Sequence, residues 1–269
     1  MPQRPPPSSP PSSTAAPTGS TPGSLETSLR QAWAALDWKA QDSATAQGVF
    51  VAFFALEAWR PWLDAMRTLL DAPESERVAR KRRPRDADDL VLAYGLHRLV
   101  LGLATGCEAR AVPLARDGLG RPCLRDETVQ TSLSHADGAV AVAVARHGPV
   151  GVDIEAAARA AQMDEIADAV LHPSERAAMA ALSAPDRALA LLALWVRKEA
   201  LLKAAGIGLA REMHGFRAPD AIRVPLPAIE GPDGADVVVR MVDAGRGWLA
   251  AVAAHPDARI ASAWLPPPR

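Results

Sequence analysis

The 269-residue sequence has little cysteine, no excess of charge of one sign and no long apolar run. Its two cysteines, Cys107 and Cys123, are too few for a disulfide scaffold and are interpreted as buried side chains in a reducing cytoplasm. Its 30 Lys and Arg residues nearly match its 31 Asp and Glu residues, which argues against a nucleic-acid binder. The longest apolar candidate, Ala188 to Val196, is too short to span a membrane. We therefore expect a soluble, cytoplasmic protein with neither nucleic-acid nor membrane partners.

Proline, serine and threonine dominate residues 1–24, which hold eight prolines and no apolar core. This composition is unlike a signal peptide and cannot offset its ordering entropy by burial, so it predicts a disordered tail. Residues 25–48 are expected to form an N-terminal helical extension. The hydrophobic content of 49% supports a sizeable core beyond it. We divide that core into a first half at 49–150 and a second half at 151–269, which carries the candidate metal site.

The first half begins with a continuous apolar run at 49–56, which predicts a buried strand. A helix is expected from Asp86 to about Ala104, and residues 107–114 can form a strand. Alternating Ala and Val predict a further strand at 139–145. Since a turn sequence follows, we expect this strand to form a hairpin with the next strand, at 150–155.

The second half predicts a helix at 162–171 and a short helix capped by the sequence His-Pro-Ser-Glu at 172–175. A long helix then begins after Ser183 and ends at Ala205, because Ser is a good N-cap and Gly206 a good stop. Short strands are expected near 215–229, 236–242, 247–254 and 258–264. Each half thus combines a long helix with a small, mostly antiparallel sheet, which defines an α+β fold.

Asp153 and Glu155 stand two residues apart on the predicted strand at 150–155. On a strand, residues i and i+2 point to the same face, so these carboxylates project together while Ile154 points into the core. Adjacent carboxylates repel each other unless a cation lies between them, and an all-oxygen site suits Mg²⁺ or Mn²⁺. The alternative is a solvated strand edge, where charged residues are common.

Trp195, Glu199 and Lys203 recur at i, i+4 and i+8 and share one helix stripe. The stripe offers a third carboxylate for a metal ion and a cation for a phosphate. The alternative is a surface Glu–Lys pair worth roughly a few tenths of a kcal/mol. Five leucines flank the stripe: Leu191, Leu192, Leu194, Leu201 and Leu202. Because so much apolar surface borders the charges, we expect them to be partly shielded from solvent.

Two further segments carry polar groups that suit phosphate binding. Ser134 and His135 precede the strand at 139–145, and Gly120-Arg121-Pro122 is a turn with a cation. Taken alone, each is typical of a structural role, and no Gly-x-Ser-x-Gly elbow indicates a hydrolase. A basic run before the first long helix is typical of a solvated helix face and can also receive a terminal phosphate. The run comprises Arg77, Arg80, Lys81, Arg82, Arg83 and Arg85.

Four motifs occur in a recognisable order. They are Gly-Arg-Pro at 120–122, Leu-Ser-His at 133–135, Gly-Val-Asp-Ile-Glu at 151–155, and Trp-x-x-Lys-Glu-Ala-x-x-Lys-x-x-Gly-x-Gly-Leu at 195–209. With this order, the chain resembles the 4′-phosphopantetheinyl transferase superfamily, in its larger, surfactin-type branch, over about residues 49–265. The resemblance implies two similar α/β halves related by a pseudo-twofold axis, with coenzyme A bound between them. It also implies transfer of the phosphopantetheine arm to a serine of an apo acyl or peptidyl carrier protein, releasing adenosine 3′,5′-bisphosphate.

The resemblance also implies roles for individual residues. Asp153, Glu155 and Glu199 would hold Mg²⁺, with Mn²⁺ as the alternative ion, against the pyrophosphate of coenzyme A. Lys203 would contact the phosphate being cleaved. Glu199, directly or through a metal-bound water, would take the proton of the acceptor serine. His135 would join Glu199, Lys203 and Asp153 as a catalytic residue.

Other residues would bind the nucleotide end of coenzyme A. Ser134 and His135 would contact phosphate, and Gly120, Arg121 and Pro122 would line the adenine-nucleotide pocket. Glu175 matches another acidic position near the metal. The chain departs from the family at Asp89, where a basic residue usually contacts a coenzyme A phosphate. We expect a cation of the preceding segment to replace it: Arg82, Arg83 or Arg85.

Two other functions remain open at this stage. The chain could be a non-catalytic module that binds a carrier protein or coenzyme A, although such a module needs no metal site. It could also be a metal-dependent phosphodiesterase that transfers the group to water. The two-lobed branch suggests a monomer.

Overall fold

The computed structural model describes Thr27, Arg30 and residues 48–125, 129–230, 233–245 and 247–268. The predicted tail at 1–24 lies outside the described residues. Of the predicted extension, only Thr27, Arg30 and Gly48 are described, and the first two are helical. No helix within the described ranges is both long and apolar enough to cross a membrane.

The described chain mixes strands and helices along its length. The strands are β1 (Gly48–Ala55), β2 (Leu114–Arg116), β3 (Pro122–Leu124), β4 (Gln130–Ala136), β5 (Ala139–Ala145), β6 (Gly151–Ala156), β7 (Arg223–Pro225), β8 (Asp236–Val242), β9 (Trp248–Ala254) and β10 (Arg259–Trp264). The α-helices are α2 (Leu56–Trp59), α3 (Leu63–Arg67), α4 (Ala72–Ala79), α5 (Pro84–Thr105), α6 (Ala167–Val170), α7 (Pro173–Ala180) and α8 (Ala184–Ala205). The 3₁₀ helices are η2 (Arg60–Trp62), η3 (Ala109–Ala111), η4 (Ala157–Ile166), η5 (Gly208–Ala210) and η6 (Met213–Gly215).

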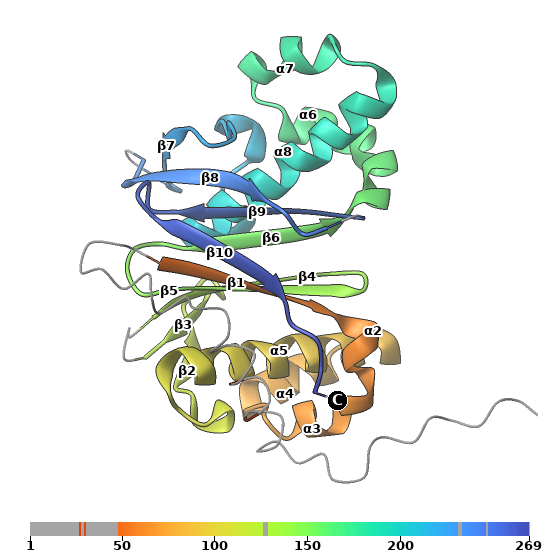
Figure 1. Cartoon of the computed structure of the whole chain (residues 1–269). Coiled ribbons are helices and arrows are strands. Elements are labelled where there is room, and N and C mark those ends of the chain that lie inside the picture. The colour runs from red at the N-terminus through yellow and green to blue at the C-terminus, as the bar shows by residue number, and fades with distance from the viewer. Residues whose placement is uncertain are drawn as a thin grey trace, which may run out of the picture.

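Two four-stranded sheets form the middle of the molecule, with strand orders β10-β1-β5-β4 and β6-β9-β8-β7. They pack face to face, α5 covers the outer face of the first sheet, and α8 covers the outer face of the second (Figure 1). This arrangement of mixed helix and sheet is compatible with the predicted α+β class. The pseudo-twofold relation between the halves and their boundary at residue 150 remain predictions.

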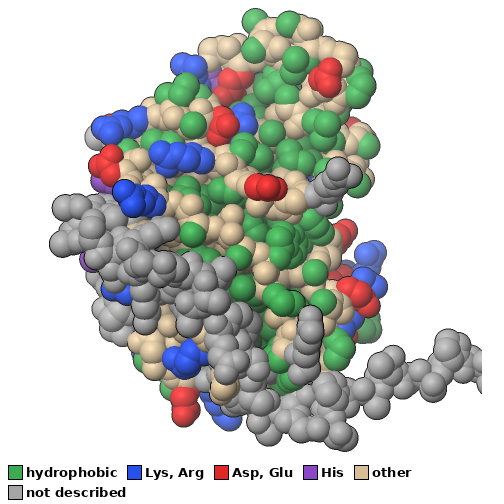
Figure 2. Space-filling model, viewed as in Figure 1, with side chains coloured by type: hydrophobic (Ala, Val, Ile, Leu, Met, Phe, Trp, Pro, Cys, Tyr) green, Lys and Arg blue, Asp and Glu red, His purple; other side chains and the backbone are tan. Residues whose placement is uncertain are grey.

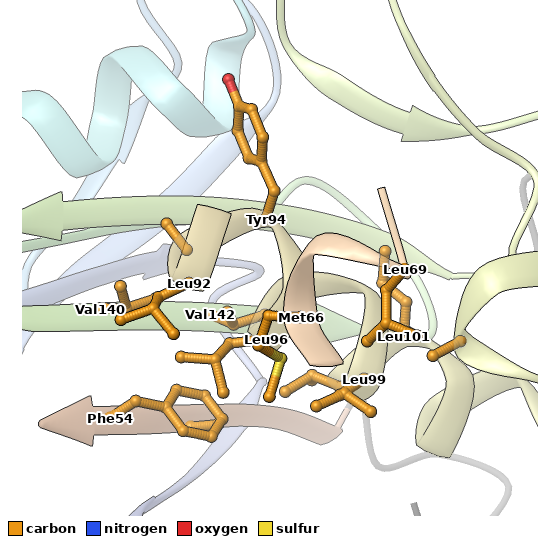
Figure 3. Packing of buried hydrophobic residues seen from close by; sticks show 14 of the residues in the cluster. Phe54, Met66, Leu69, Leu92, Tyr94, Leu96, Leu99, Leu101, Val140 and Val142 are labelled. Atoms are coloured by element: carbon orange, nitrogen blue, oxygen red, sulfur yellow. The ribbon is translucent and has the colours of Figure 1, made fainter. Parts of the chain in front are cut away.

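Small side chains allow the two sheets to approach. Every residue of β5 is buried, and its alternating sequence divides between two cores. Its alanines face the second sheet, where they meet Val152 and Ile154 of β6. Its valines face α5 and pack among larger side chains such as Phe54 and Leu96 (Figure 3). Tyr94 points away from these apolar side chains in Figure 3, and its ring lies 5.2 Å from the guanidinium carbon of Arg116.

The predicted hairpin between residues 139–145 and 150–155 is wrong. The strand β5 pairs with β4 on one side and β1 on the other, whereas β6 pairs with β9 in the second sheet. Both edges of β5 are therefore already occupied within the first sheet. The intervening turn, in which Gly148 adopts φ +74°, instead carries the chain from one sheet to the other.

The C-terminal strand β10 returns to the first sheet, where it runs parallel to β1. The described C-terminal segment thus contributes to the sheet of the first half as well as to that of the second. On the face seen in Figure 2, hydrophobic side chains reach the surface around the junction of the two sheets.

Two local predictions differ from the structure. Residues 109–111 form the 3₁₀ helix η3 and not a strand, and carbonyls of this region accept hydrogen bonds from the buried guanidinium of Arg98. The expected helix at 162–171 is largely the 3₁₀ helix η4, followed by the short α6. Cys107 and Cys123 are free thiols of intermediate burial.

The predicted limits of α8 are confirmed. The hydroxyl of Ser183 accepts a hydrogen bond from the amide of Asp186, which satisfies a free N–H of the first turn. Gly206 follows the last helical residue with φ +73°, a left-handed conformation that glycine adopts without strain. The helix therefore holds Glu199 and Lys203 on a rigid scaffold one turn apart.

Candidate active site

Asp153 is the centre of the candidate site. Asp153 is 4% exposed to solvent. Its carboxylate oxygen Oδ1 accepts hydrogen bonds from the Ser134 hydroxyl and the Lys203 ammonium, both at 2.7 Å. These three residues lie on β4, β6 and α8, so the first sheet, the second sheet and the second long helix meet at one carboxylate oxygen. Motifs about fifty residues apart in the sequence are thus brought into contact.

Serines of β4 bind the edge of the second sheet. The strand β6 is an edge strand, and its outward amides lack a neighbouring strand. The Ser132 hydroxyl accepts a hydrogen bond from the Val152 amide at 3.1 Å, and the Ser134 hydroxyl accepts one from the Ile154 amide at 3.4 Å. Because buried amides need partners, the serines determine how β6 sits against the first sheet. Ser134 therefore both positions Asp153 and donates to it.

The other two predicted carboxylates lie beside Asp153. Burial, followed by the negative charge of Asp153, raises the pKa of Glu155 to about 7 and also raises the pKa of Glu199. The charged form of each carboxyl is thus disfavoured by burial and by repulsion from the neighbouring carboxylates. A cation bound among the carboxylates would reduce this repulsion.

The donor chemistry of the cluster fits Mg²⁺. All three candidate ligands are carboxylates, which hard divalent cations prefer. The second oxygen of Asp153, Oδ2, is buried and accepts no hydrogen bond from the described part of the chain. Across the described ranges, however, no three His, Cys, Asp or Glu side chains are grouped closely enough to hold an ion in their present positions. Asp153 and Glu155 instead pair with Lys203 and Arg159.

His135 lies at the partly exposed side of the site. The surrounding protein, followed by the charge of Lys203, lowers the pKa of the imidazole below its ordinary value of 6.5. Lys81, in the predicted basic run, adds to this lowering, so that segment lies near the site. Asp89 opposes the lowering and is itself bound by Arg60, with 2.6 Å between Nη2 and Oδ1.

Arg60, from a segment that sequence reasoning did not consider, therefore pairs with Asp89, and the expected phosphate contact by Arg82, Arg83 or Arg85 stays a prediction. Arg82, Arg83 and Arg85 are exposed at the start of α5, where Arg83 is the N-cap residue. Their position beside Lys81 leaves them available to an anion in solution.

A cavity of about 210 Å³ joins two of the predicted motifs. Gly120, Arg121 and Pro122 line one side of it, and Lys203 and Gly206 line the other. A Cβ atom on Gly206 would lie 2.9 Å from Cδ of Arg121, so glycine at this position lets the arginine pack over the end of α8. The turn at 120–122 and the cation of α8 thus share one pocket.

A second cavity, of about 650 Å³, lies beside the carboxylates. His135, Glu155, Arg159 and Gln162 are among the residues that line it. The carboxylate cluster is therefore accessible to a ligand from this side, while the turn pocket lies on the side of Lys203.

Glu175 does not contact the other carboxylates through any of the interactions observed for it. Its carboxylate binds the Lys198 ammonium at 2.9 Å and accepts hydrogen bonds from the amides of His172 and Ala218. Lys198 is fully buried and also donates to the carbonyls of Val170 and Met213. This pair joins α7, α8 and the segment after α8, which is a structural role.

Sequence reasoning missed three residues of the site. Arg159 pairs with Glu155, Ser132 binds the β6 backbone, and Arg116 lines the turn pocket while donating to the Gly120 carbonyl. The spacing of four residues between Glu155 and Arg159 is a signal that could have indicated the first. The other two follow only from contacts between distant segments.

Comparison with known proteins agrees with the motif order. The family model described as the 4′-phosphopantetheinyl transferase superfamily matches residues 149–240, which include β6 and α8. The resemblance to this superfamily inferred from the motifs is confirmed over this segment, which is about a third of the chain, whereas its surfactin-type branch remains a prediction.

Three relatives have names of the same kind. The 4′-phosphopantetheinyl transferase of Bacillus subtilis is 28% identical over 199 residues, which cover 72% of this chain and 86% of that protein. The 4′-phosphopantetheinyl transferase HetI of Nostoc sp. strain PCC 7120 is 26% identical over 164 residues, covering 57% and 69%. A Synechocystis sp. protein with a provisional name of this type is 24% identical over 153 residues, and the match spans 62% of its length. All three names describe a transferase of this type.

Proposed function

We propose that the chain transfers the 4′-phosphopantetheine arm of coenzyme A to a serine of an apo carrier protein, with Mg²⁺ as cofactor and adenosine 3′,5′-bisphosphate as the second product. The observation that carries the proposal is the meeting of Ser134, Asp153 and Lys203 at one carboxylate oxygen. These residues come from three of the four family motifs. The names of the relatives support the same reaction class.

The reaction displaces one phosphate oxygen by another. The serine oxygen of the carrier forms a bond to the phosphorus next to the pantetheine, and the bond from that phosphorus to the bridging oxygen breaks. Such transfers depend on positioning and on neutralisation of charge more than on covalent chemistry from the protein. Asp153, Glu155 and Glu199 would hold Mg²⁺, which would supply the charge that neutralises the pyrophosphate oxygens.

Two protein groups handle protons and charge in this proposal. Glu199 takes the proton of the attacking serine, and the raised pKa of its carboxyl makes it a better base than a solvated carboxylate. Lys203 stabilises the leaving phosphate, for which it must exchange its contact with Asp153 for one with the ligand.

The nucleotide end of coenzyme A would lie in the pocket of Gly120, Arg121 and Pro122, which opens toward Lys203. His135 lines the larger cavity, and Ser134 precedes it on β4; both would contact phosphate. The exposed cations of the basic run would receive the terminal 3′-phosphate, with Arg82, Arg83 and Arg85 as candidates.

A single assay tests the proposal against both alternatives. The full chain is mixed with coenzyme A, Mg²⁺ and several apo carrier domains, and the intact mass of each carrier is recorded. Mass gain that disappears on addition of EDTA supports the transferase. Cleavage of coenzyme A without an acceptor would identify a phosphodiesterase instead, and binding without turnover would identify a binding module.

Two substitutions test the assigned residues. We expect Asp153→Ala and Glu199→Gln each to abolish turnover, because loss of one ligand or base at a charged transition state costs several kcal/mol of barrier. Circular dichroism should show an unchanged fold in both variants. Near wild-type rates in either variant would exclude the assignment of the carboxylates.

A further inference from the structure

Arg159 occupies the side of the carboxylate cluster that faces the larger cavity. It lies on η4, four residues after Glu155, and its Nη1 forms an ion pair with Glu155 Oε1. Its guanidinium carbon also lies 4.9 Å from the centre of the Trp195 ring. The segment that follows β6 packs against α8, so the cation is held between the strand and the helix that carry the candidate metal ligands.

One cation acts on two carboxylates of the cluster. Glu155, near the end of β6, precedes Arg159 of η4 by four residues, and Trp195 precedes Glu199 by one turn of α8. The charge of Arg159 acts on both Glu155 and Glu199. A divalent ion bound by the same two carboxylates would therefore meet a positive charge already in place.

The contact with Trp195 gives Arg159 a second support that does not depend on Glu155. A guanidinium over an indole ring is attracted by the ring electrons. The side chain of Arg159 is 36% exposed, and it lines the cavity of about 650 Å³ together with Glu155 and Gln162. The cavity therefore adjoins the guanidinium beside both Glu155 and the ring.

We propose that Arg159 is a positioning residue that competes with the divalent ion for Glu155. It neutralises this carboxylate before the ion binds and moves along the Trp195 ring when the ion takes its place. The inference rests on the proposed function, because the ion is the one that the proposed transfer requires.

The competition has a measurable consequence. An ion that must break the Arg159–Glu155 pair binds more weakly than it would to a free carboxylate. A partly exposed ion pair changes such an equilibrium by about fivefold. Removal of the Arg159 charge should therefore tighten metal binding, whereas removal of an ordinary supporting residue would weaken it.

The test measures Mn²⁺ binding to the full-length protein without coenzyme A, from the electron paramagnetic resonance signal of the free ion. We expect Arg159→Gln to lower the dissociation constant about fivefold, and Arg159→Lys, which keeps the cation, to stay near wild type. Arg176→Gln is the control, because Arg176 forms a 2.6 Å ion pair with Asp168 in the same half of the chain. It should leave Mn²⁺ binding unchanged.

The outcomes separate this inference from the proposed function. If Arg159→Gln binds Mn²⁺ no more tightly than wild type does, the proposed role of Arg159 is overturned and the transferase proposal is left intact. If wild type itself binds no Mn²⁺, both the metal centre of the proposed function and the present inference are lost. Tighter binding in Arg159→Gln together with rescue by Arg159→Lys supports the competition.

Discussion

Gly151 determines how closely β6 can approach α8, and its replacement should disturb both the fold and the site. A Cβ atom at this position would lie 2.0 Å from the Ala200 carbonyl oxygen and 2.4 Å from the Ala204 amide nitrogen. Both atoms belong to helix backbone and cannot rotate away. To reach ordinary contact distance, Gly151→Ala must move the strand and the helix apart by roughly 1.5 Å.

The losses of stability and of turnover in Gly151→Ala follow from this displacement. Overpacking of a close contact typically costs about 1–3 kcal/mol, and ~2 kcal/mol lowers Tm by roughly 4–8 °C in a protein of this size. Because Asp153 is two residues from Gly151 and Lys203 is adjacent to Ala204, the same movement separates the carboxylate from its ammonium partner. A misplacement of about 1 Å can reduce turnover by ~10²-fold.

Differential scanning fluorimetry and the carrier mass assay measure the two effects. Gly48→Ala is the matched control, because a Cβ on this strand glycine would meet no atom of the described residues within 4 Å, apart from its chain neighbours, and should be tolerated. A Gly151→Ala protein that melts and turns over like Gly48→Ala would refute the reasoning. Such a result would mean that β6 and α8 do not touch at this position.

Two further predictions concern buried charges. Lys198→Met should lower the free energy of unfolding by about 3–5 kcal/mol in a urea titration, because it leaves the partly buried Glu175 carboxylate without its ammonium partner; an unchanged midpoint would show that the pair contributes little. The second prediction concerns Glu155 in the presence of EDTA, where the free energy of unfolding should fall as pH rises from 4.5 toward 7. The reason is that the pKa of Glu155 is about 7 in the folded chain, which therefore binds the proton more tightly than the unfolded chain does. The fall should stay below ~3 kcal/mol, since solvent screens a partly exposed group, and it should be smaller in Glu155→Gln. Parallel pH profiles of the two proteins would contradict this assignment.

Local signals in the sequence predicted the long helices well. Ser183 and Gly206 act on backbone groups within a few residues, so the limits of α8 follow from nearby chemistry. The stripe of Glu199 and Lys203 likewise follows from helical periodicity. For the same reason, the capped start of α7 at His172 was predicted, since its capping box involves residues only three positions apart.

Strand pairing was predicted poorly because it depends on distant partners. The alternating Ala and Val of β5 are compatible with pairing to any strand, and the turn sequence after β5 favoured pairing with β6. In the structure, β1 and β4 occupy both edges of β5, so β6 crosses to the other sheet. No local feature of residues 139–155 distinguishes these arrangements.

The sequence by itself therefore supplied the residue types of the candidate site, namely carboxylates at 153, 155 and 199 and a lysine at 203, and motifs in an order that resembles one superfamily. Only the tertiary structure decided how these groups meet. It placed Ser134 and Lys203 on the same oxygen of Asp153, Arg159 on Glu155, and Arg60 on Asp89. The physical reason is that residue type and helical spacing are local properties, whereas these contacts depend on two sheets and a helix that pack across long separations in the chain.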